Sequence, residues 1–331
     1  MKIILAGGRG HVGAVLRRSM ARDHELVVLS RISTPLGNAA RVVTWDGETM
    51  GDWTEELDGA DVVINLAGRS VDCRYHARNL AQMLESRLKS TTAIGRAIAL
   101  ARRPPRVWLQ ASTATIYAHR HEAPNDELTG RIGGSEPGAP QKWNASVAIA
   151  LAWEEALAMA ATPFTRKVAL RSAMTMSRDH GSVFDVLARL ARRGLGGTIG
   201  TGQQYVSWIH EDDFVDAIRF IIEHDELSGA VNLAAPEPLR NRDFMTALRK
   251  ATGRGWGLPT PRAILEIGCW LLRTESELVL KSRRVVPRRL LEAGFSFRHP
   301  SWPEAALDLA KGTAPSSANG LPTKKHQPAP A

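Results

Sequence analysis

The sequence has few of the features that mark a secreted, membrane-spanning or metal-binding protein. Its 331 residues include two cysteines, Cys73 and Cys269, which lie too far apart in the sequence to suggest a disulfide framework. No window approaches the 18 or so consecutive apolar residues of a membrane span. The opening segment MKIILAGG has the pattern of a strand and lacks a signal-peptide cleavage region. We therefore expect a reduced, cytoplasmic protein with no membrane partner.

The charge balance is basic, with 43 Lys and Arg against 34 Asp and Glu and a net charge of +9. Such an excess is found in nucleic-acid-binding proteins, but here the basic residues are spread along the chain. The densest cluster, residues 281–289 (KSRRVVPRR), is interleaved with apolar residues. We interpret it as a helix with a solvated face. No nucleic-acid partner is expected, and an anionic cofactor would account for part of the charge bias.

The most informative pattern lies in residues 1–33. An apolar run at 2–6 leads into GGRGHVG at 7–13, a helical segment follows to about residue 21, and a second apolar run covers 26–29. A strand, a glycine turn, a helix and a second strand in this order form the opening unit of a dinucleotide-binding fold.

The chemistry of such a site explains the glycines. Gly7 allows a sharp turn after the strand, Gly10 allows the backbone to approach a pyrophosphate, and Gly13 allows the helix to pack closely on the sheet. Free N–H groups at the helix N-terminus then face the phosphates. The predicted cofactor-binding loop consists of Gly7, Arg9, Gly10, His11, Val12 and Gly13.

The residues after the second strand predict which dinucleotide binds. An acidic residue there would bind the ribose 2′-hydroxyl of NAD, whereas an Arg accommodates the 2′-phosphate of NADP. The sequence has Ser30-Arg31, with Arg9 in the loop, which favours NADP(H) over NAD. The alternative is that both arginines are ordinary solvated side chains. Asp46, after the run 42–45, either reaches the adenine or forms a turn before a glycine.

Further candidate residues follow the later strands of the predicted sheet. The strand 61–65 ends in Leu66, Ala67 and Gly68, where the chain would pass close to the cofactor. A long helical pattern over 77–101 carries Arg87, which could reach the site. Hydroxyl side chains at the end of the strand 106–110 are suited to binding a carbonyl or hydroxyl group that is reduced or oxidised, the alternative being that they bond nearby backbone. The residues predicted from these later strands are Ser112, Thr113, Tyr117 and, after the strand 167–170, Arg171.

The remaining segments suggest two lobes and a tail. We expect an α/β fold with a doubly wound parallel sheet over residues 1–175, to which 205–235 returns, and a smaller C-terminal lobe over 176–310. Residues 130–140 are rich in Gly and Pro and are predicted to form a flap over the substrate. His119 and His121 lack a third ligand cluster, so no metal site is predicted. The tail, 312–331, is predicted to be disordered.

The chain resembles the extended, atypical short-chain dehydrogenases/reductases, in particular the NAD(P)-dependent epimerase-like group with a C-terminal domain of unknown function. Members of this group are often labelled epimerase or SulA-like cell division inhibitor. The resemblance spans nearly all of residues 1–310. The blocks that carry it are GGRGHVG (7–13), DVVINLAG (61–68), ESRLKST (85–91), ASTATIY (111–117), GLGGTIGTGQQYVSWIHEDD (194–213), SGAVNLAAPEP (228–238) and SRRVVPRRLLEAGFSFRHP (282–300).

The resemblance implies an NADP-binding Rossmann domain with a C-terminal substrate lobe, and it exposes a departure. Catalytically competent extended members carry the motif Tyr-x-x-x-Lys on the helix that follows the strand with the catalytic Ser or Thr. The Tyr of this motif transfers a proton. This chain contains no such motif. Alignment on Glu154 places Ser146 at the Tyr position and Ala150 at the Lys position, and Thr113 falls on the catalytic Ser/Thr position. The other candidate proton donors are Tyr117, Lys142 and His210.

Two functional hypotheses follow. The first is an NADP-dependent oxidoreductase or epimerase with an unorthodox acid or base, acting on a small molecule that the sequence does not identify. The second is a non-catalytic NADP(H)-binding redox sensor or regulatory interaction protein on the same fold. The glycine-dense segment 194–210 favours the enzyme, because it is suited to enclosing a substrate. Many superfamily members dimerise through helices, so a homodimer is the protein partner that the resemblance suggests.

Overall fold

The computed structural model describes residues 1–37, 40–136, 139–272 and 275–311. One sheet contains the strands β1 (Lys2–Ala6), β2 (Glu25–Ser30), β3 (Arg41–Thr44), β4 (Val62–Asn65), β5 (Val107–Thr113), β6 (Arg166–Ser172) and β10 (Gly229–Leu233). All seven strands are parallel, in the order β10-β6-β5-β4-β1-β2-β3. The order reverses at β1, so the carboxyl ends of β1 and β4 flank the point where this fold class binds ligands.

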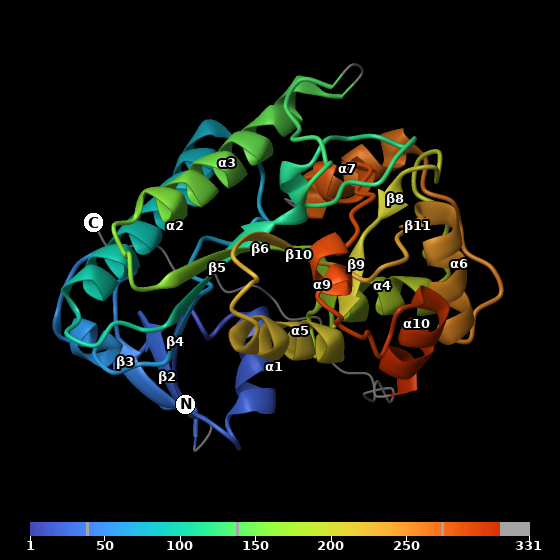
Figure 1. Ribbon diagram of the computed structural model, residues 1–331. Helices are drawn as coiled ribbons and strands as arrows, with labels where there is room; N and C mark the ends of the chain where they lie inside the picture. Colours follow the sequence, from blue (N-terminus) through green and yellow to red (C-terminus); the bar gives the residue numbers. More distant parts are fainter. Residues whose placement is uncertain (38–39, 137–138, 273–274, 312–331) are drawn as a thin grey trace.

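Helices cover both faces of the sheet (Figure 1). One face packs against α1 (His11–Met20), α5 (Glu211–Glu223) and α9 (Arg288–Glu292), and the other packs against η1 (Asp52–Leu57), α2 (Ala77–Leu100) and α3 (Asn144–Met159). Every residue of β4 is buried, which explains why its sequence is continuously apolar up to Asn65. The predicted doubly wound Rossmann-type fold is confirmed.

A smaller C-terminal lobe lies beyond the β10 edge of the sheet (Figure 1). Its elements are β7 (Met174–Met176), α4 (Val183–Arg192), β8 (Tyr205–Val206), β9 (Trp208–His210), β11 (Leu239–Arg240), α6 (Asn241–Ala251), α7 (Arg262–Leu272), α8 (Glu277–Leu280) and α10 (Trp302–Lys311). Its core contains Trp302, whose ring stacks on that of Phe244 at a centroid distance of 4.0 Å. Short 3-10 turns, η2 (Ala114–Ile116) and η3 (Gln141–Trp143), precede α3.

Two expectations about local structure need correction or qualification. Residues 281–287 are extended rather than helical, and Lys281 and Arg283 are buried rather than solvated, 1% and 9% exposed. Residues 130–136, expected to lie in a flap, are tied to the strand-end segment: Gly133 N–H donates to Ile116 O at 2.9 Å and Ala118 N–H donates to Arg131 O at 2.8 Å. The rest of that predicted flap includes 137–138, and the predicted disordered tail is 312–331; both lie outside the described residues.

Within the part of the chain that the structure describes, none of the helices combines the length and the apolar character that crossing a bilayer requires.

Candidate functional site

The glycine loop between β1 and α1 is shaped for close contact with a ligand. Gly7 has φ +74°, and a Cβ there would lie 2.8 Å from Ala67 Cα. A Cβ on Gly13 would lie 2.3 Å from Gly8 O, so these two positions are closed by the protein itself. At Gly10, by contrast, the nearest atom in the described structure is Gly7 O at 3.8 Å. Gly10 begins α1 without a side-chain cap, which leaves N–H groups directed at this open space. The loop therefore fits a dinucleotide pyrophosphate.

The two loop residues that follow, His11 and Val12, face different neighbours. Val12 packs against the core under the sheet. His11 Nε2 lies 2.6 Å from Ser177 Oγ, just after β7, and 3.9 Å from Asp179. Burial lowers the pKa of His11. The start of α1 is thus connected through His11 to the C-terminal lobe.

Two arginines lie at the end of β2. Arg9 reaches across from the glycine loop, and its guanidinium donates to Ile32 O (3.2 Å) and Thr34 O. Arg31 is exposed, and Ser30 Oγ accepts the N–H of Ile32 at 3.0 Å. Both guanidinium groups therefore belong to the loop after β2, where a 2′-phosphate would lie.

Asp46 has a local structural role. Its carboxylate accepts the N–H groups of Glu48 and Thr49, both at 2.8 Å, and the Thr49 hydroxyl at 2.5 Å. These hydrogen bonds lower the pKa of Asp46. Of the two sequence interpretations, the turn before Gly47 is the one that the observed contacts support.

The end of β4 lies against the glycine loop. The Asn65 side chain fixes this turn, because its Oδ1 accepts Ala67 N–H at 3.0 Å. Leu66 packs partly into the core, and Gly68 is exposed. Arg87 lies beneath this turn rather than in the open: its guanidinium donates to Arg69 O at 3.1 Å and lies 4.8 Å from the Trp153 ring centroid.

A hydrogen-bond network joins the ends of β5 and β6. Arg171 binds both carboxylate oxygens of Glu154, at 2.8 and 2.7 Å, and Ser112 Oγ donates to one of them at 2.6 Å. Arg171 also donates to the hydroxyl of Tyr117, which donates to Asn232 Oδ1, both at 2.9 Å. Tyr117 is 2% exposed, and burial raises its pKa. Its hydroxyl is thus engaged in a buried network.

Thr113 and Ser146 have different partners. Thr113 Oγ1 accepts Thr115 N–H at 3.1 Å and caps η2. Ser146, on the first turn of α3, donates to Glu277 Oε2 at 2.7 Å. The other oxygen, Glu277 Oε1, is buried and has no hydrogen-bond partner in the described structure. A carboxyl group from the C-terminal lobe thus meets Ser146, the position to which alignment on Glu154 assigns the superfamily's Tyr.

The surroundings of Glu277 are unusually rich in buried ionisable groups. Lys281 Nζ lies 3.8 Å from Glu277 Oε1 and donates to Thr115 O at 2.8 Å, while Arg283 Nε donates to Thr115 Oγ1 at 3.2 Å. Burial raises the pKa of Glu277 and lowers the pKa of Lys281 to about 8. Burial also raises the pKa of the neighbouring Tyr75 to about 12. Shifts of this kind are common where side chains exchange protons.

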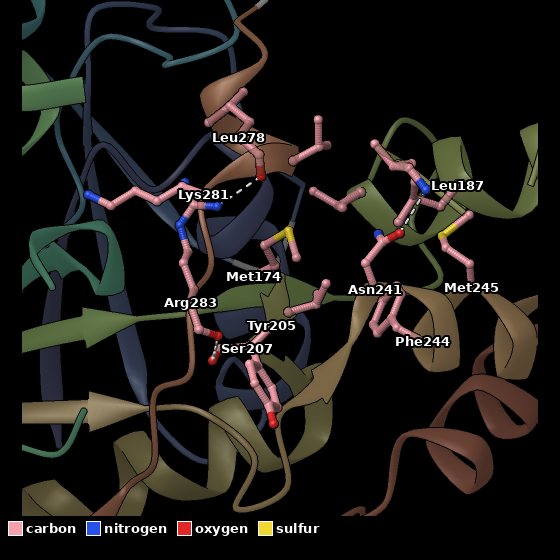
Figure 2. Close-up of a pocket in the computed structure, with 14 residues that line it drawn as sticks. Met174, Leu187, Tyr205, Ser207, Asn241, Phe244, Met245, Leu278, Lys281 and Arg283 are labelled. Atoms are coloured by element: carbon pink, nitrogen blue, oxygen red, sulfur yellow. Dashed lines mark hydrogen bonds between the residues drawn. The ribbon is translucent and has the colours of Figure 1, made fainter. Parts of the chain in front are cut away.

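Two cavities flank this cluster. One, of about 210 Å³, is lined by Arg74, Tyr75, Lys142, Trp143, Glu275 and Glu277. The other, of about 60 Å³, is mostly apolar and lies in the C-terminal lobe beside Arg283. Figure 2 shows Arg283 directed toward Leu278, to whose carbonyl it donates at 2.9 Å, and Lys281 extending away from Met245 and Leu187. The larger cavity is lined by Glu277, the hydrogen-bond partner of Ser146.

The remaining proton-donor candidate, His210, is engaged at the start of α5. Its Nδ1 accepts Asp212 N–H at 3.1 Å, and burial lowers its pKa to about 4. Asp212, His299 and Asp308 lie close enough to His210 to resemble a metal-binding group. With Nδ1 accepting a backbone N–H, the neutral ring carries its proton on Nε2, which lies 3.3 Å from Asp308 but has no hydrogen-bond partner in the described structure.

The fold and the loop together define an NAD(P)-binding protein of the short-chain dehydrogenase/reductase kind. Residues 3–234 match the NAD dependent epimerase/dehydratase family, and residues 260–309 match a domain of unknown function, DUF1731. The chain belongs to the NAD dependent epimerase/dehydratase family, as the sequence resemblance indicated.

Individual relatives match over nearly the whole chain. The bovine epimerase family protein SDR39U1 is 31% identical over 91% of this chain and 96% of its own length. The crystal structure of human SDR39U1 (isoform 2) with NADPH has a TM-score of 0.80 at 27% identity, covering 94% of this chain and 99% of that one. A nucleoside-diphosphate sugar epimerase from Corynebacterium glutamicum has a TM-score of 0.72 at 25% identity, covering 94% and 58%.

Sequence reasoning missed the partners of Ser146. Glu277 is 131 positions away in the sequence, and neither Tyr75 nor Lys281 belongs to a motif with a known chemical role. The one available signal was the family block 282–300, whose first residues overlap the basic cluster 281–289 that predicts a helix with a solvated face. A segment in which basic residues are interleaved with Val and Pro is equally compatible with an extended, buried conformation.

Proposed function

We propose that this protein is an NADP(H)-dependent oxidoreductase or epimerase that acts on a small molecule beside Ser146. The observation that carries the proposal is the 2.7 Å hydrogen bond from Ser146 Oγ to the buried carboxyl group of Glu277. It supplies an acid–base pair at the helix position where the superfamily's Tyr is missing. The enzyme is proposed to be cytoplasmic; the homodimer stays a prediction from the sequence.

The cofactor part of the proposal rests on the glycine loop and on two arginines. Open space over Gly10, with the first N–H groups of α1 around it, fits the pyrophosphate. Arg9 and Arg31, in the loop after β2, would bind the 2′-phosphate that distinguishes NADP from NAD. The NADPH in the human SDR39U1 structure supports the same choice.

The proton part of the proposal follows from the environment of Glu277. Reduction of a carbonyl breaks its π bond, adds a hydride to carbon and adds a proton to oxygen; NADPH, when bound, supplies the hydride. Ser146 would give its proton to the substrate oxygen and regain one from Glu277. Burial raises the pKa of Glu277 and so keeps a larger fraction protonated near neutral pH. Lys281 Nζ, 3.8 Å away, would return the proton to Glu277.

The oxygen that is reduced must also be positioned. Thr113 ends β5 at the carboxyl edge of the sheet and is half-buried. We propose that its hydroxyl orients the substrate oxygen, as the superfamily position implies. Tyr117, by contrast, is committed to Arg171 and Asn232, so we give it a structural role in the network below the site.

The second candidate is a redox sensor that binds NADPH without turnover. It is favoured by one observation: the strand-end residues Ser112 and Tyr117 are both engaged in internal hydrogen bonds. A sensor would need the glycine loop but no proton donor.

Calorimetry with NADPH, followed by NADPH oxidation with a panel of small aldehydes and ketones, separates the two candidates. An oxidoreductase binds NADPH and consumes it with at least one carbonyl compound, and both Thr113→Val and Ser146→Ala reduce the rate at least tenfold. Thr246→Val on α6, where the hydroxyl donates to Arg242 O and accepts from Arg249, is the matched control and keeps the full rate. NADPH binding without oxidation by any compound favours the sensor, and absence of NADPH binding refutes both.

A further inference from the structure

The cavity of about 210 Å³ is assembled from three segments that are far apart in the sequence. Arg74 and Tyr75 precede α2, Lys142 belongs to η3, and Glu275 and Glu277 come from the C-terminal lobe. Exposure falls from one side of the cavity to the other. The side chains of Lys142 and Arg74 are 50% and 42% exposed, whereas the side chain of Glu277 is 2% exposed. The cavity therefore has an entrance with two half-exposed cations and a buried end at Glu277, whose carboxyl group accepts a hydrogen bond from Ser146.

Two buried polar atoms of the lining residues lack partners. Trp143 Nε1 and Glu277 Oε1 are both without a hydrogen-bond partner in the described structure. A buried polar group left unpaired costs roughly 1–3 kcal/mol. One of these atoms is a donor and the other an acceptor, or a donor when Glu277 is protonated. Both atoms are inaccessible in the described structure, so they are unpaired polar groups within the cavity wall rather than contacts that are open to a ligand.

The cations at the entrance are only loosely neutralised. Glu275 forms an ion pair with each of them: Arg74 Nε lies 3.8 Å from Glu275 Oε1, and Lys142 Nζ lies 3.6 Å from Glu275 Oε2. These separations exceed hydrogen-bond length. Glu275 Oε1 is instead bonded to Tyr75 N–H at 2.9 Å. The second carboxylate near Lys142, that of Glu266, is 4.0 Å away. Donors on both cations are thus oriented by ion pairs but remain able to bind another carboxylate.

The buried end holds one carboxyl group and two cations. Lys281 Nζ is 3.8 Å from the Glu277 carboxyl group, and Arg283 donates to the Glu277 backbone carbonyl at 3.3 Å. At the entrance, Arg74 and Lys142 face Glu275 and Glu266 at 3.6–4.0 Å, beyond hydrogen-bond length. A carboxylate ligand would supply the short contacts that these two cations lack, so its anionic group would lie at the entrance and its uncharged oxygen at the inner end.

We propose that this cavity is the substrate site and that its ligand is a small carboxylic acid carrying a carbonyl or hydroxyl group. The carboxylate binds Arg74 and Lys142, and the carbonyl or hydroxyl oxygen faces Ser146. This inference rests on the proposed function.

The volume sets the size of the ligand. Pockets for drug-sized ligands measure about 300–1,000 Å³. The 210 Å³ cavity is smaller than such pockets. A nucleoside diphosphate sugar, the ligand class in the name of the Corynebacterium relative, is at least drug-sized, so we expect this cavity to suit a smaller ligand.

The test measures binding and does not depend on turnover. The full chain is titrated calorimetrically with short-chain 2-oxo and 2-hydroxy acids, with the methyl ester of each acid, and with UDP-glucose, both with and without saturating NADPH. The ester removes the charge at nearly constant size. We expect at least one acid to bind saturably, its ester to bind at least tenfold more weakly, and UDP-glucose not to compete with it.

Variants locate the binding. Lys142→Gln and Arg74→Gln should each weaken the acid at least tenfold and leave NADPH affinity unchanged, and the control Lys250→Gln, at an exposed position of α6, should alter neither. The inference is overturned if no acid binds, if the ester binds equally well, if UDP-glucose displaces the acid, or if Lys142→Gln leaves the affinity for the acid unchanged. Failure of NADPH binding, measured separately, would instead refute the proposed function.

Discussion

Two alanine substitutions in the glycine loop test whether a pyrophosphate lies where the structure leaves space. Gly10→Ala places a methyl group into the open region, where the nearest protein atom is Gly7 O at 3.8 Å. Its φ of −69° suits any L-residue. Gly13→Ala places a methyl group 2.3–2.6 Å from three backbone atoms of Gly8, so the loop must shift. We therefore expect the first substitution to leave the stability of the ligand-free protein unchanged and the second to lower it.

The magnitudes differ accordingly. Overpacking costs about 1–3 kcal/mol, more where backbone must move, and each kcal/mol lowers Tm by roughly 2–4 °C in a protein of some two hundred residues. Gly13→Ala should therefore lower Tm by several degrees. For Gly10→Ala we expect little change in Tm, because a small loss of capping is offset by the lower entropy of the unfolded chain. Its affinity for NADPH should fall at least tenfold, which is about 1.4 kcal/mol.

The assay pairs thermal unfolding without ligand with calorimetric titration of NADPH. Gly253→Ala is unsuitable as a control because Gly253 has φ +77°, whereas Gly255 has no positive φ and no atom within 4 Å of an added Cβ. Gly255→Ala should change neither quantity. If Gly10→Ala binds NADPH as tightly as the unaltered chain, the phosphates do not lie over Gly10 and the assignment of the loop is wrong.

Three further predictions test other parts of the structure. Arg31→Asp should reduce the preference for NADPH over NADH at least tenfold, measured as the ratio of their dissociation constants, because it replaces a cation beside the 2′-phosphate by an anion. Tyr117→Phe leaves Arg171 and Asn232 without a shared partner and should cost about 1–3 kcal/mol in urea unfolding, with NADPH affinity unchanged. Lys281 has its pKa lowered from 10.5 to about 8 by burial, so between these pH values the unfolded chain binds more protons and stability rises with pH. Lys281→Met should flatten that rise in urea unfolding, and an unchanged slope would show that Lys281 titrates normally.

Much of the sheet could be predicted because its strands have local signatures. β1 and β4 are short apolar runs that are buried on both faces, and the glycine spacing identifies the turn between β1 and α1. The helix predicted over 77–101 is α2, Ala77–Leu100, since its apolar positions repeat along one face. Such patterns depend on neighbours within a few residues, so they are present in the sequence itself.

The extended segment 281–287 shows where local patterns fail. The five basic residues of the cluster 281–289, interleaved with Val and Pro, suggested a solvated helix, yet Lys281 and Arg283 are buried. Their burial is tolerated because backbone carbonyls and Glu277 surround them: Lys281 donates to Thr115 O, and Arg283 donates to Leu278 O. No composition rule anticipates partners that are supplied by another lobe of the protein.

The sequence by itself determined the dinucleotide fold, the phosphate-binding turn and the absence of Tyr-x-x-x-Lys, because each depends on residues within a few positions of one another. Only the tertiary structure decided which side chain meets Ser146, the position to which alignment on Glu154 assigns the Tyr of that motif. The pairing of Ser146 with Glu277 crosses 131 positions, and the cavity beside it is closed by side chains from three distant segments. Contacts of this kind follow from how the C-terminal lobe packs on the sheet, which depends on the whole core rather than on any local stretch.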